Sequence, residues 1–261
     1  MRRLFSKTKL KNFLQNNYEA EFQKNETPRI GLITLSTDFT IEQDFRNLIY
    51  KKPVNLYVNR IPFENPMNRK NYLKMKNKLS VIAENILPGE SINTIAYGCT
   101  SGTIAIGEKE VIKQISAVKK NCYVTTPITA ALKAFKKLSL NKVAVLTPYP
   151  KIVNKTIFDH LEKNNINVTS FSSFNIESDK DVAMIKKESI INTIKSINNN
   201  KLDGVFISCT AMPVLSIIKD IENIIKKPVL TSNQVTIWDC LRSIKMNSPI
   251  YGFGKLLESE K

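Results

Sequence analysis

The sequence predicts an α/β protein made of two similar halves, each with a parallel sheet that is covered by helices on both faces. Short apolar segments typical of buried strands alternate strictly with segments of helical periodicity. The order of these segments is repeated once, with a boundary near Leu140. A length of 261 residues is sufficient for one large domain or two small ones.

Four strands and four helices are expected in the first half. Each strand is a mostly apolar run, and each is followed by a segment with helical spacing. The second helical segment stops at Pro88 and Gly89, a pair that ends helices and forms turns. Strands are expected at 29–36, 55–61, 91–99 and 122–127, and helices at 40–49, 69–86, 103–118 and 128–137.

The second half repeats this pattern. RIGLITLS corresponds to KVAVLTPY, AYGCT to FISCT, and VTTPITAAL to LTSNQVTIW, and each half has about the size of a flavodoxin-like unit. Strands are expected at 142–148, 167–174, 203–209 and 228–233, and helices at 151–164, 181–199, 214–225 and 235–244. We therefore expect a basic helical leader over 1–28, an N-terminal half over 29–140 and a C-terminal half over 141–261. The last helix of the chain is a candidate for packing back on the first half.

The chain carries a formal net charge of +16 at pH 7. Such an excess is common in proteins that bind nucleic acids. However, the lysines are spread along the whole chain, and the sequence has no arginine-rich tract, zinc-finger spacing or aromatic–basic RNA-binding signature. We therefore expect no nucleic-acid partner and assign the charge, at most, to the attraction of small anions.

The apolar runs are all much shorter than the roughly 20 residues of a membrane-spanning helix. The first residues, MRRLFSKTKLKNFLQNN, are basic but lack the continuous apolar segment and cleavage site of a secretory signal. A cytoplasmic protein without a membrane partner is expected. The apolar side chains of this leader favour packing against the core or a second copy, as in a homodimer.

Cysteine and histidine usage limits the possible chemistry. Cys99, Cys122, Cys209 and Cys240 form no CxxC pair, and the only histidine, His160, lies on the expected polar face of a helix. A zinc site, a disulfide framework, and Ser-His-Asp or Cys-His catalysis are therefore disfavoured. GxGxxG and GxxxxGK[ST] motifs are also absent, so we expect neither a metal nor an organic cofactor.

Two short segments are the most informative part of the sequence. IAYGCTSGT and VFISCTAMP each place a Cys-Thr pair at the end of an apolar strand and before a helical pattern. A sulfur in that position lies near free backbone N–H groups and the positive end of a helix dipole, which favours a thiolate. The alternative is that these cysteines are inert core residues. The matched pair favours Cys99 and Cys209 as the reactive thiols and leaves core packing to Cys122 and Cys240.

Polar side chains follow most of the expected strands. In parallel sheets, ligands bind beyond the carboxyl ends of the strands. Hydroxyls, amides and the first N–H groups of helices suit carboxylate oxygens, which predicts a small carboxylate substrate. The expected binding residues are Ser36, Asp38, Thr100, Ser101, Tyr149, Thr210 and Asn233.

The segments GLITLSTDFTIEQDF, YGCTSGT, VLTPYP, ISCTAMP and PVLTSNQVTIWDCLR resemble the aspartate/glutamate racemase superfamily. The resemblance covers residues 29 to about 244 and is closest to the branch of maleate cis–trans isomerase, arylmalonate decarboxylase and ectoine-utilisation proteins. It implies a cofactor-independent enzyme whose active site lies in the cleft between two pseudo-symmetric halves. In the racemases of this superfamily, two cysteines act on opposite faces of the substrate, and Cys99 and Cys209 match both positions.

One residue departs from the pattern of the maleate isomerases. Their first strand is followed by an Asn that binds a substrate carboxylate, and this chain has Asp38 at that position. An ionised Asp favours a substrate with a cationic nitrogen, such as an amino acid or an ectoine-like amidine. Equally, Asp38 suits a helix N-cap. Tyr149 matches a Tyr that contacts a carboxylate in maleate isomerases, although an ordinary half-buried aromatic is the alternative.

The sequence therefore predicts a two-cysteine racemase or isomerase of a small carboxylate. The backbone N–H groups at Thr100–Ser101 and Thr210–Ala211 are expected to stabilise the developing enediolate. Alternatives are a maleate cis–trans isomerase, an arylmalonate-type decarboxylase, and, outside enzymes, a two-lobed protein that binds a small molecule. The presence of both cysteines disfavours a standard arylmalonate decarboxylase, which resembles this chain but uses one.

Overall fold

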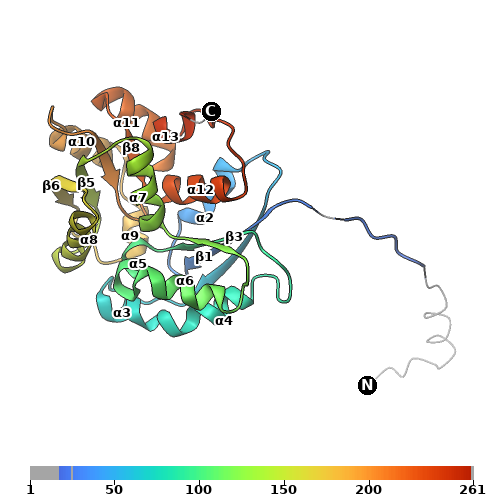
Figure 1. Cartoon of the computed structure of the whole chain (residues 1–261). Helices are drawn as coiled ribbons and strands as arrows, with labels where there is room; N and C mark the ends of the chain where they lie inside the picture. Colours follow the sequence, from blue (N-terminus) through green and yellow to red (C-terminus); the bar gives the residue numbers. More distant parts are fainter. Residues whose placement is uncertain (1–17, 25, 260–261) are drawn as a thin grey trace, which may run out of the picture.

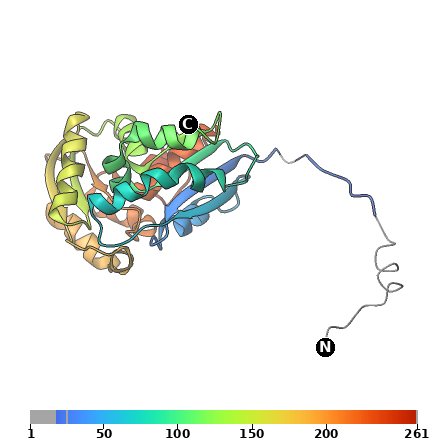
Figure 2. The same ribbon diagram turned by 90° about the horizontal axis from the view of Figure 1, so that it is seen from below.

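The structure, a computed structural model, describes residues 18–24 and 26–259. Residues 18–24 and 26–28 lead away from the folded body in an irregular path (Figures 1 and 2), and Tyr18 and Phe22 on it are almost fully exposed. This part contains no helix, so the expected helical leader is wrong for these residues. A short segment without a surface to pack on gains too little from helix formation. The rest of the expected leader lies outside the described residues.

Two parallel four-stranded sheets form the framework (Figure 1). The first has the order β2-β1-β3-β4 and the second the order β6-β5-β7-β8, so the two halves have the same topology. Most of the strands are fully buried on both faces, as their apolar composition predicts. The strands are β1 (Arg29–Leu35), β2 (Asn55–Ile61), β3 (Thr94–Gly98), β4 (Tyr123–Thr125), β5 (Lys142–Thr147), β6 (Asn167–Ser173), β7 (Gly204–Ile207) and β8 (Val229–Thr231).

The helices of the first half lie in the expected order, but two of the expected helices are divided. The segment 69–86 contains two short α-helices joined by a 3-10 turn, and the segment after β3 is divided at Gly107, whose φ of 95° an L side chain rarely adopts. The elements are α2 (Ile41–Leu48), α3 (Arg69–Lys74), η1 (Lys76–Lys78), α4 (Leu79–Glu84), α5 (Thr100–Ile106), α6 (Glu108–Ser116) and α7 (Pro127–Lys137).

The second half also has two divided helices, and it ends in a short helix that the sequence pattern did not predict. The elements are α8 (Lys151–Lys163), α9 (Asp179–Ala183), α10 (Lys187–Ile197), η2 (Leu215–Ile217), α11 (Ile218–Ile225), α12 (Ser232–Ser243) and α13 (Lys255–Glu258). Within residues 18–24 and 26–259, no helix combines the length and the apolar character that crossing a bilayer requires.

Local capping fixes two helices directly at the ends of their strands. Thr126 follows β4, accepts the N–H of Thr129 at 3.3 Å, and is followed by Pro127 at the first helical position. Thr231 at the end of β8 forms a capping box with Gln234, with distances of 3.1 and 3.3 Å. The corresponding positions of the two halves therefore begin their helices in the same way.

Helix α12 packs against α7, β3 and α2, which all belong to the first half (Figure 1). A buried polar cluster fixes this contact. Asp239 of α12 accepts hydrogen bonds from Thr125 at 2.6 Å, Tyr123 at 2.8 Å and Lys133 at 2.9 Å. The two halves thus share a helix, and this contact holds the ends of their strands in a fixed relation.

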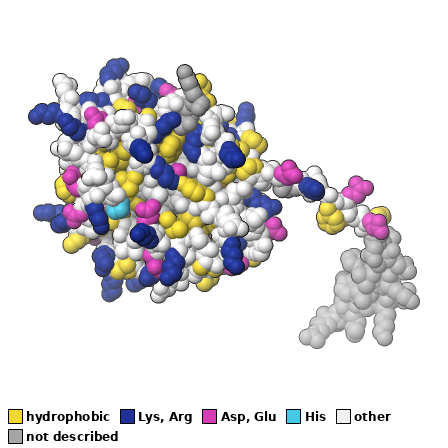
Figure 3. All heavy atoms as spheres, in the orientation of Figure 1, with side chains coloured by type: hydrophobic (Ala, Val, Ile, Leu, Met, Phe, Trp, Pro, Cys, Tyr) yellow, Lys and Arg dark blue, Asp and Glu magenta, His cyan; other side chains and the backbone are white. Residues whose placement is uncertain are grey.

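The surface agrees with the spread of lysines along the sequence. On the face that Figure 3 shows, Lys and Arg side chains are scattered among acidic and neutral ones and do not gather in one patch.

Candidate active site

Cys99 directly follows β3 and is the N-cap of α5. Its Sγ accepts a hydrogen bond from the backbone N–H of Gly102 at 3.2 Å, and only 4% of the residue is exposed. The sequence prediction of a sulfur at a strand end and a helix start is therefore met at this position.

Gly102 is required for this contact. A Cβ at position 102 would lie 2.7 Å from the Cys99 Sγ and 2.7 Å from the Tyr97 hydroxyl, closer than real Cβ atoms approach. The absence of a side chain lets the backbone of the first turn of α5 approach the sulfur.

Cys209 lies two residues beyond β7 and is also 4% exposed. The residues after it form a turn, and regular helix resumes only with η2 at Leu215. The helical segment expected at 214–225 is therefore present, but its first residue is six positions after the cysteine and not directly after it. The Ala211 N–H takes the place of a helix N-terminus, since it hydrogen-bonds to the sulfur and favours the thiolate.

Direct contacts join the two cysteine segments. The Thr210 hydroxyl donates to the Gly98 carbonyl oxygen at 3.4 Å, which connects the residue after Cys209 to the residue before Cys99. Thr100 and Ser232 share a hydrogen bond of 2.9 Å between their hydroxyls. All of these residues are buried, so the carboxyl ends of β3 and β7 meet in one enclosed region.

Tyrosine side chains surround the two sulfurs. The hydroxyl of Tyr149 at Cys209 and that of Tyr97 at Cys99 favour the thiolate at each position, although the Tyr97 hydroxyl also donates to the Met75 sulfur at 3.5 Å. The pKa of Tyr149 and that of Tyr72 are raised well above the usual value by burial and by the proximity of both cysteines. Tyr149 therefore lies where the sequence placed it. Tyr72 of α3 was not predicted, because its position in the sequence is that of an ordinary core aromatic.

Burial disfavours the thiolate at both cysteines. Burial raises the pKa of Cys99 to about 12 and that of Cys209 well above its usual range. The N–H contacts oppose this effect but are outweighed, because a buried thiolate loses its hydration. The reactive thiolate thus stays a prediction, with the N–H groups of Gly102 and Ala211 in its favour and burial against it.

Asp38 lies two residues before Thr40, the N-cap residue of α2, and its side chain binds the first N–H groups of this helix. Its Oδ1 accepts from the N–H groups of Thr40 at 2.7 Å and Ile41 at 3.0 Å, and the side chain is 4% exposed. Burial raises the pKa of Asp38, while these N–H groups and the nearby Thr210 hydroxyl oppose the increase. The capping role that the sequence allowed is thus present. Its Oδ2, also buried, makes no hydrogen bond of normal geometry within the described chain.

A second acidic residue near the cysteines was not predicted. Asp179 begins α9, is 3% exposed, and accepts a hydrogen bond from the Thr37 hydroxyl at 2.5 Å. Its negative charge raises the pKa of both cysteine thiols. Burial in turn raises the pKa of Asp179 to about 6. Its sequence context, Ser178-Asp179-Lys180, indicates only a helix start, so nothing local connected it with the site.

Asn233 ties the Cys209 turn to the first half. Its amide donates to the Asp44 carboxylate at 2.7 Å and to the Thr210 carbonyl at 2.9 Å. Thr40 adds a hydrogen bond of 2.8 Å from its hydroxyl to the Ala211 carbonyl. Asn233 is therefore close to the site, as expected, but its N–H groups are used to position the backbone after Cys209.

Among the remaining expected binding residues, Thr100, Ser101 and Ala211 are buried in the cysteine region. Ser36 differs from them because it is exposed, and its hydroxyl accepts from the Phe63 N–H at 3.0 Å. It therefore fixes the loop after β2.

Cys122 and Cys240 lie outside this region. Cys240 is fully buried in α12, and Cys122 is half-buried at the start of β4. This matches the packing role expected for both. No group of three or more His, Cys, Asp or Glu side chains within residues 18–24 and 26–259 is arranged to hold a metal ion.

A cavity of about 150 Å³ adjoins the site. It is lined by Tyr72 and Ser101, by the exposed Arg69, and by apolar residues that include Ile152 and Val153 of α8. The cavity therefore combines a hydroxyl-bearing wall with one cation and an apolar wall. It is suited to admit or hold part of a small acid.

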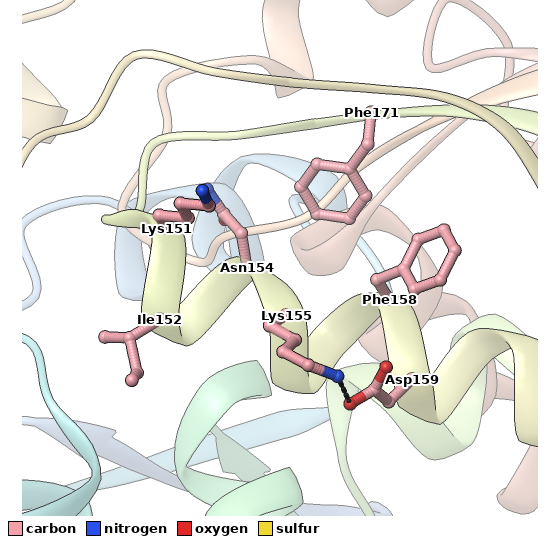
Figure 4. Close-up of a pocket in the computed structure, with 7 residues that line it drawn as sticks. All are labelled: Lys151, Ile152, Asn154, Lys155, Phe158, Asp159 and Phe171. Atoms are coloured by element: carbon pink, nitrogen blue, oxygen red, sulfur yellow. Dashed lines mark hydrogen bonds and ion pairs between the residues drawn. The ribbon is translucent and has the colours of Figure 1, made fainter.

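A second hollow, of about 650 Å³, lies on the outer side of α8 and β6 (Figure 4). Phe158 and Phe171 form one side of it, and Lys155 is paired with Asp159 at 2.6 Å. None of the expected site residues lines it. The cysteine region is therefore the better candidate for chemistry.

Comparison with known proteins agrees with this geometry. The model of the arylmalonate decarboxylase family matches residues 66–257. The maleate isomerase of Alcaligenes faecalis is 24% identical over 249 residues, which cover 90% of this chain and 98% of the relative. The solved maleate isomerase Iso from Pseudomonas putida S16 superposes with a TM-score of 0.83 at 21% identity, covering 88% of this chain and 98% of that one.

A third comparison concerns a mutant maleate cis–trans isomerase from Nocardia farcinica, solved with a covalently bound succinylcysteine intermediate. It has a TM-score of 0.83 and 20% identity, with 90% of this chain and 99% of that chain covered. Together these comparisons confirm the fold, the superfamily branch and the class of cysteine-based enzyme that the sequence predicts.

Proposed function

The chain belongs to the arylmalonate decarboxylase family, and from this premise we propose that it is a cysteine-dependent cis–trans isomerase of a small unsaturated carboxylate, of the maleate type. The observation that carries this proposal is the meeting of Cys99 and Cys209 in one buried region, joined through Thr210 and Gly98. In sequence, relatives named as maleate isomerases match nearly the whole chain, whereas a relative named arylmalonate decarboxylase matches 45% of it. In structure, solved arylmalonate decarboxylases also cover 90% of the chain, with TM-scores of 0.80 and 0.74.

The reaction needs one thiolate and one thiol. The thiolate adds to one carbon of the double bond. The electron pair of that bond moves to the other carbon and is delocalised onto the carboxylate attached to it, which gives an enediolate. The other cysteine then gives its proton to the carbon that was not attacked, and the intermediate is a saturated thioether. Rotation about the new single bond precedes the reverse steps, in which the proton returns to the second sulfur and the C–S bond breaks to give the trans alkene.

The chain provides groups for each step. The first N–H groups of α5, at Thr100 and Ser101, have no partner inside the helix and can donate hydrogen bonds to an enediolate oxygen. On the other side, the turn at Thr210–Ala211 offers the Thr210 N–H, because the Ala211 N–H binds the Cys209 sulfur. A tyrosine hydroxyl favours the thiolate at each cysteine, Tyr97 at Cys99 and Tyr149 at Cys209, so either sulfur can be the attacking one. Burial raises the pKa of both thiols, so one of them has to lose a proton before it can attack.

Conversion of maleate to fumarate, followed by proton NMR, tests the proposal. Cys99→Ser and Cys209→Ser should each lower kcat at least about a thousandfold, since a hydroxyl is a far weaker nucleophile and acid in these roles. Cys122→Ser is the matched control and should keep full activity. Isomerisation that persists in the two site variants would refute the proposed mechanism.

A second candidate reaction is racemisation of an α-amino or amidine-bearing carboxylate by the same two cysteines. The observation that favours it is the pair of carboxylates, Asp38 and Asp179, whose charges act on both sulfurs. Exchange of the α-proton in D₂O, without formation of a trans alkene, distinguishes this reaction from isomerisation.

A further inference from the structure

We propose that the substrate carries a cationic nitrogen in addition to its carboxylate, and that Asp179 is the residue that selects it. This inference rests on the proposed two-cysteine chemistry at the same site and adds the charge of the second substrate group. The ligand class is a small carboxylate with a protonated amine or amidine a few bonds away.

Asp179 is a buried carboxylate with incomplete hydrogen bonding. Thr37, which donates to its Oδ2 at 2.5 Å, is the only hydrogen-bond donor to this side chain within the described chain. A carboxylate can accept several hydrogen bonds. A buried carboxylate with one donor and no cation therefore has unused acceptor capacity, which a cationic N–H group of a ligand would satisfy.

The position of Asp179 relative to the two sulfurs supports this role. Among the charged groups that act on Cys99 and on Cys209, Asp179 has the largest effect on each thiol, followed by Asp38. Its charge also acts on Tyr72. The hydrogen bonds agree with this: Thr37 binds Asp179, and Thr40 of the same loop donates to the Ala211 carbonyl, two residues after Cys209, at 2.8 Å.

The cation that acts on Asp38 is not available to a ligand. Arg60 donates to the carbonyl oxygens of Leu35 and Asp38, at 3.2 and 2.8 Å, and pairs with Glu42 at 2.9 Å. A dianionic substrate would bring two carboxylates towards Asp38 and Asp179, and among the residues that line the adjoining cavity Arg69 alone is cationic. A zwitterionic substrate would place its carboxylate on the backbone N–H groups and its cation on Asp179.

Two matched probes test the charge preference. Maleate and cis-4-aminobut-2-enoate are both four-carbon cis-alkenoates, but the first ends in a second carboxylate and the second in an ammonium group. Each is incubated with the full-length enzyme, and isomerisation is followed by proton NMR to give kcat and KM. Binding of each probe is measured by calorimetry on the Cys99→Ser/Cys209→Ser protein, which cannot turn it over.

The wild type should prefer the amino probe over maleate by at least about tenfold in kcat/KM and in Kd. Asp179→Asn should reduce this ratio at least about tenfold, mainly through KM, and Asp179→Glu should restore part of it. Asp181→Asn changes an exposed carboxylate of the same helix and should leave the ratio unchanged.

The possible outcomes separate the two proposals. If Asp179→Asn weakens both probes equally, Asp179 is only structural and the inference is wrong. A wild type that prefers maleate, or that does not bind the amino probe, also overturns it. If the binding preference is present but neither probe is isomerised, the charge selection stands and the proposed isomerase activity fails.

Discussion

The Thr210 hydroxyl donates to the carbonyl oxygen of Gly98 at 3.4 Å, and this contact joins the two segments that carry the cysteines. Gly98 ends β3 in the first half, and Thr210 follows β7 in the second. The duplication visible in the sequence thus becomes a contact between equivalent parts of the two halves. The relative placement of Cys99 and Cys209 depends on this contact and on the hydrogen bonds of Asn233.

Removal of the Thr210 hydroxyl should impair catalysis more than folding. Thr210→Val keeps the branched shape but leaves the Gly98 carbonyl without this donor, so kcat/KM should fall about tenfold through misplacement of the two sulfurs. The free energy of unfolding should fall by no more than about 1 kcal/mol, because the bond is neutral and long. Steady-state kinetics and urea unfolding measure the two effects.

The conservative variant is the control for this prediction. Thr210→Ser retains the hydroxyl and should keep most of the activity. Equal losses in the serine and valine variants would show that the methyl group of Thr210, and not its hydroxyl, positions the turn.

Alkylation of Cys99 should be slow near neutral pH and should accelerate strongly with alkalinity. Its pKa of about 12 leaves little thiolate at pH 7, and only the thiolate reacts. Below this pKa, the thiolate fraction rises about tenfold for each pH unit. Iodoacetamide labelling of the native protein, measured by mass spectrometry between pH 7 and 10, should show this slope.

Cys122 provides an internal comparison in the same experiment. Its pKa is also raised to about 12, mainly by burial, but its side chain is half-buried and therefore more accessible. It should be modified faster than Cys99 at each pH. This reverses the order of reactivity expected from the sequence. A labelling rate of Cys99 that reaches a plateau below pH 9 would show that its pKa is not raised.

The parts of the site that depend on local sequence could be predicted. An apolar strand followed by polar residues shows which side chains lie at the carboxyl end of a parallel sheet. Cys99 after β3 and Tyr149 after β5 are both found there and are buried. The strands were predicted because buried parallel strands are short continuous apolar runs. Divided helices were not, because helical periodicity continues across breaks such as that at Gly107.

The electrostatics of the site could not be predicted from local patterns. The charge of Asp179 acts on the cysteines because α9 lies against the loop after β1, where Thr37 binds this carboxylate. The raised pKa values of the thiols follow from complete burial, which is a property of the assembled halves. Asp38 has one role of each kind. Its hydrogen bonds to the start of α2 follow from its position in the sequence, whereas its charge, which raises the pKa of Cys209, acts only in the folded protein.

Gly102→Ala should damage both the site and the fold. The added methyl group would lie 2.7 Å from the Cys99 Sγ and the Tyr97 hydroxyl, and 3.0 Å from the Met75 methyl group. Relief of this overlap requires movement of the first turn of α5 away from the sulfur, at a cost of about 1–3 kcal/mol. Thermal unfolding and maleate turnover should both show the loss. Unchanged values would mean that the helix start can move freely.

The last prediction concerns Asp44, whose pKa is raised to about 7 by burial, with a contribution from the charge of Asp38. An unfolded Asp titrates near pH 4. Between these values the folded protein holds a proton that the unfolded chain has released, so Asp44 increasingly destabilises the fold as pH rises from about 4 to about 7. Asp44→Asn removes this titration, and the new amide oxygen can still accept from Asn233.

The stability of Asp44→Asn relative to the wild type should therefore be greater at pH 8 than at pH 5, by on the order of 2 kcal/mol. Urea unfolding of both proteins at the two pH values gives this difference, and the contributions of other groups such as Asp179 cancel in it. Asp220→Asn, an exposed change on α11, is the control and should show no pH-dependent difference. If Asp44→Asn has the same relative stability at both pH values, the carboxyl of Asp44 is not held protonated in the folded protein.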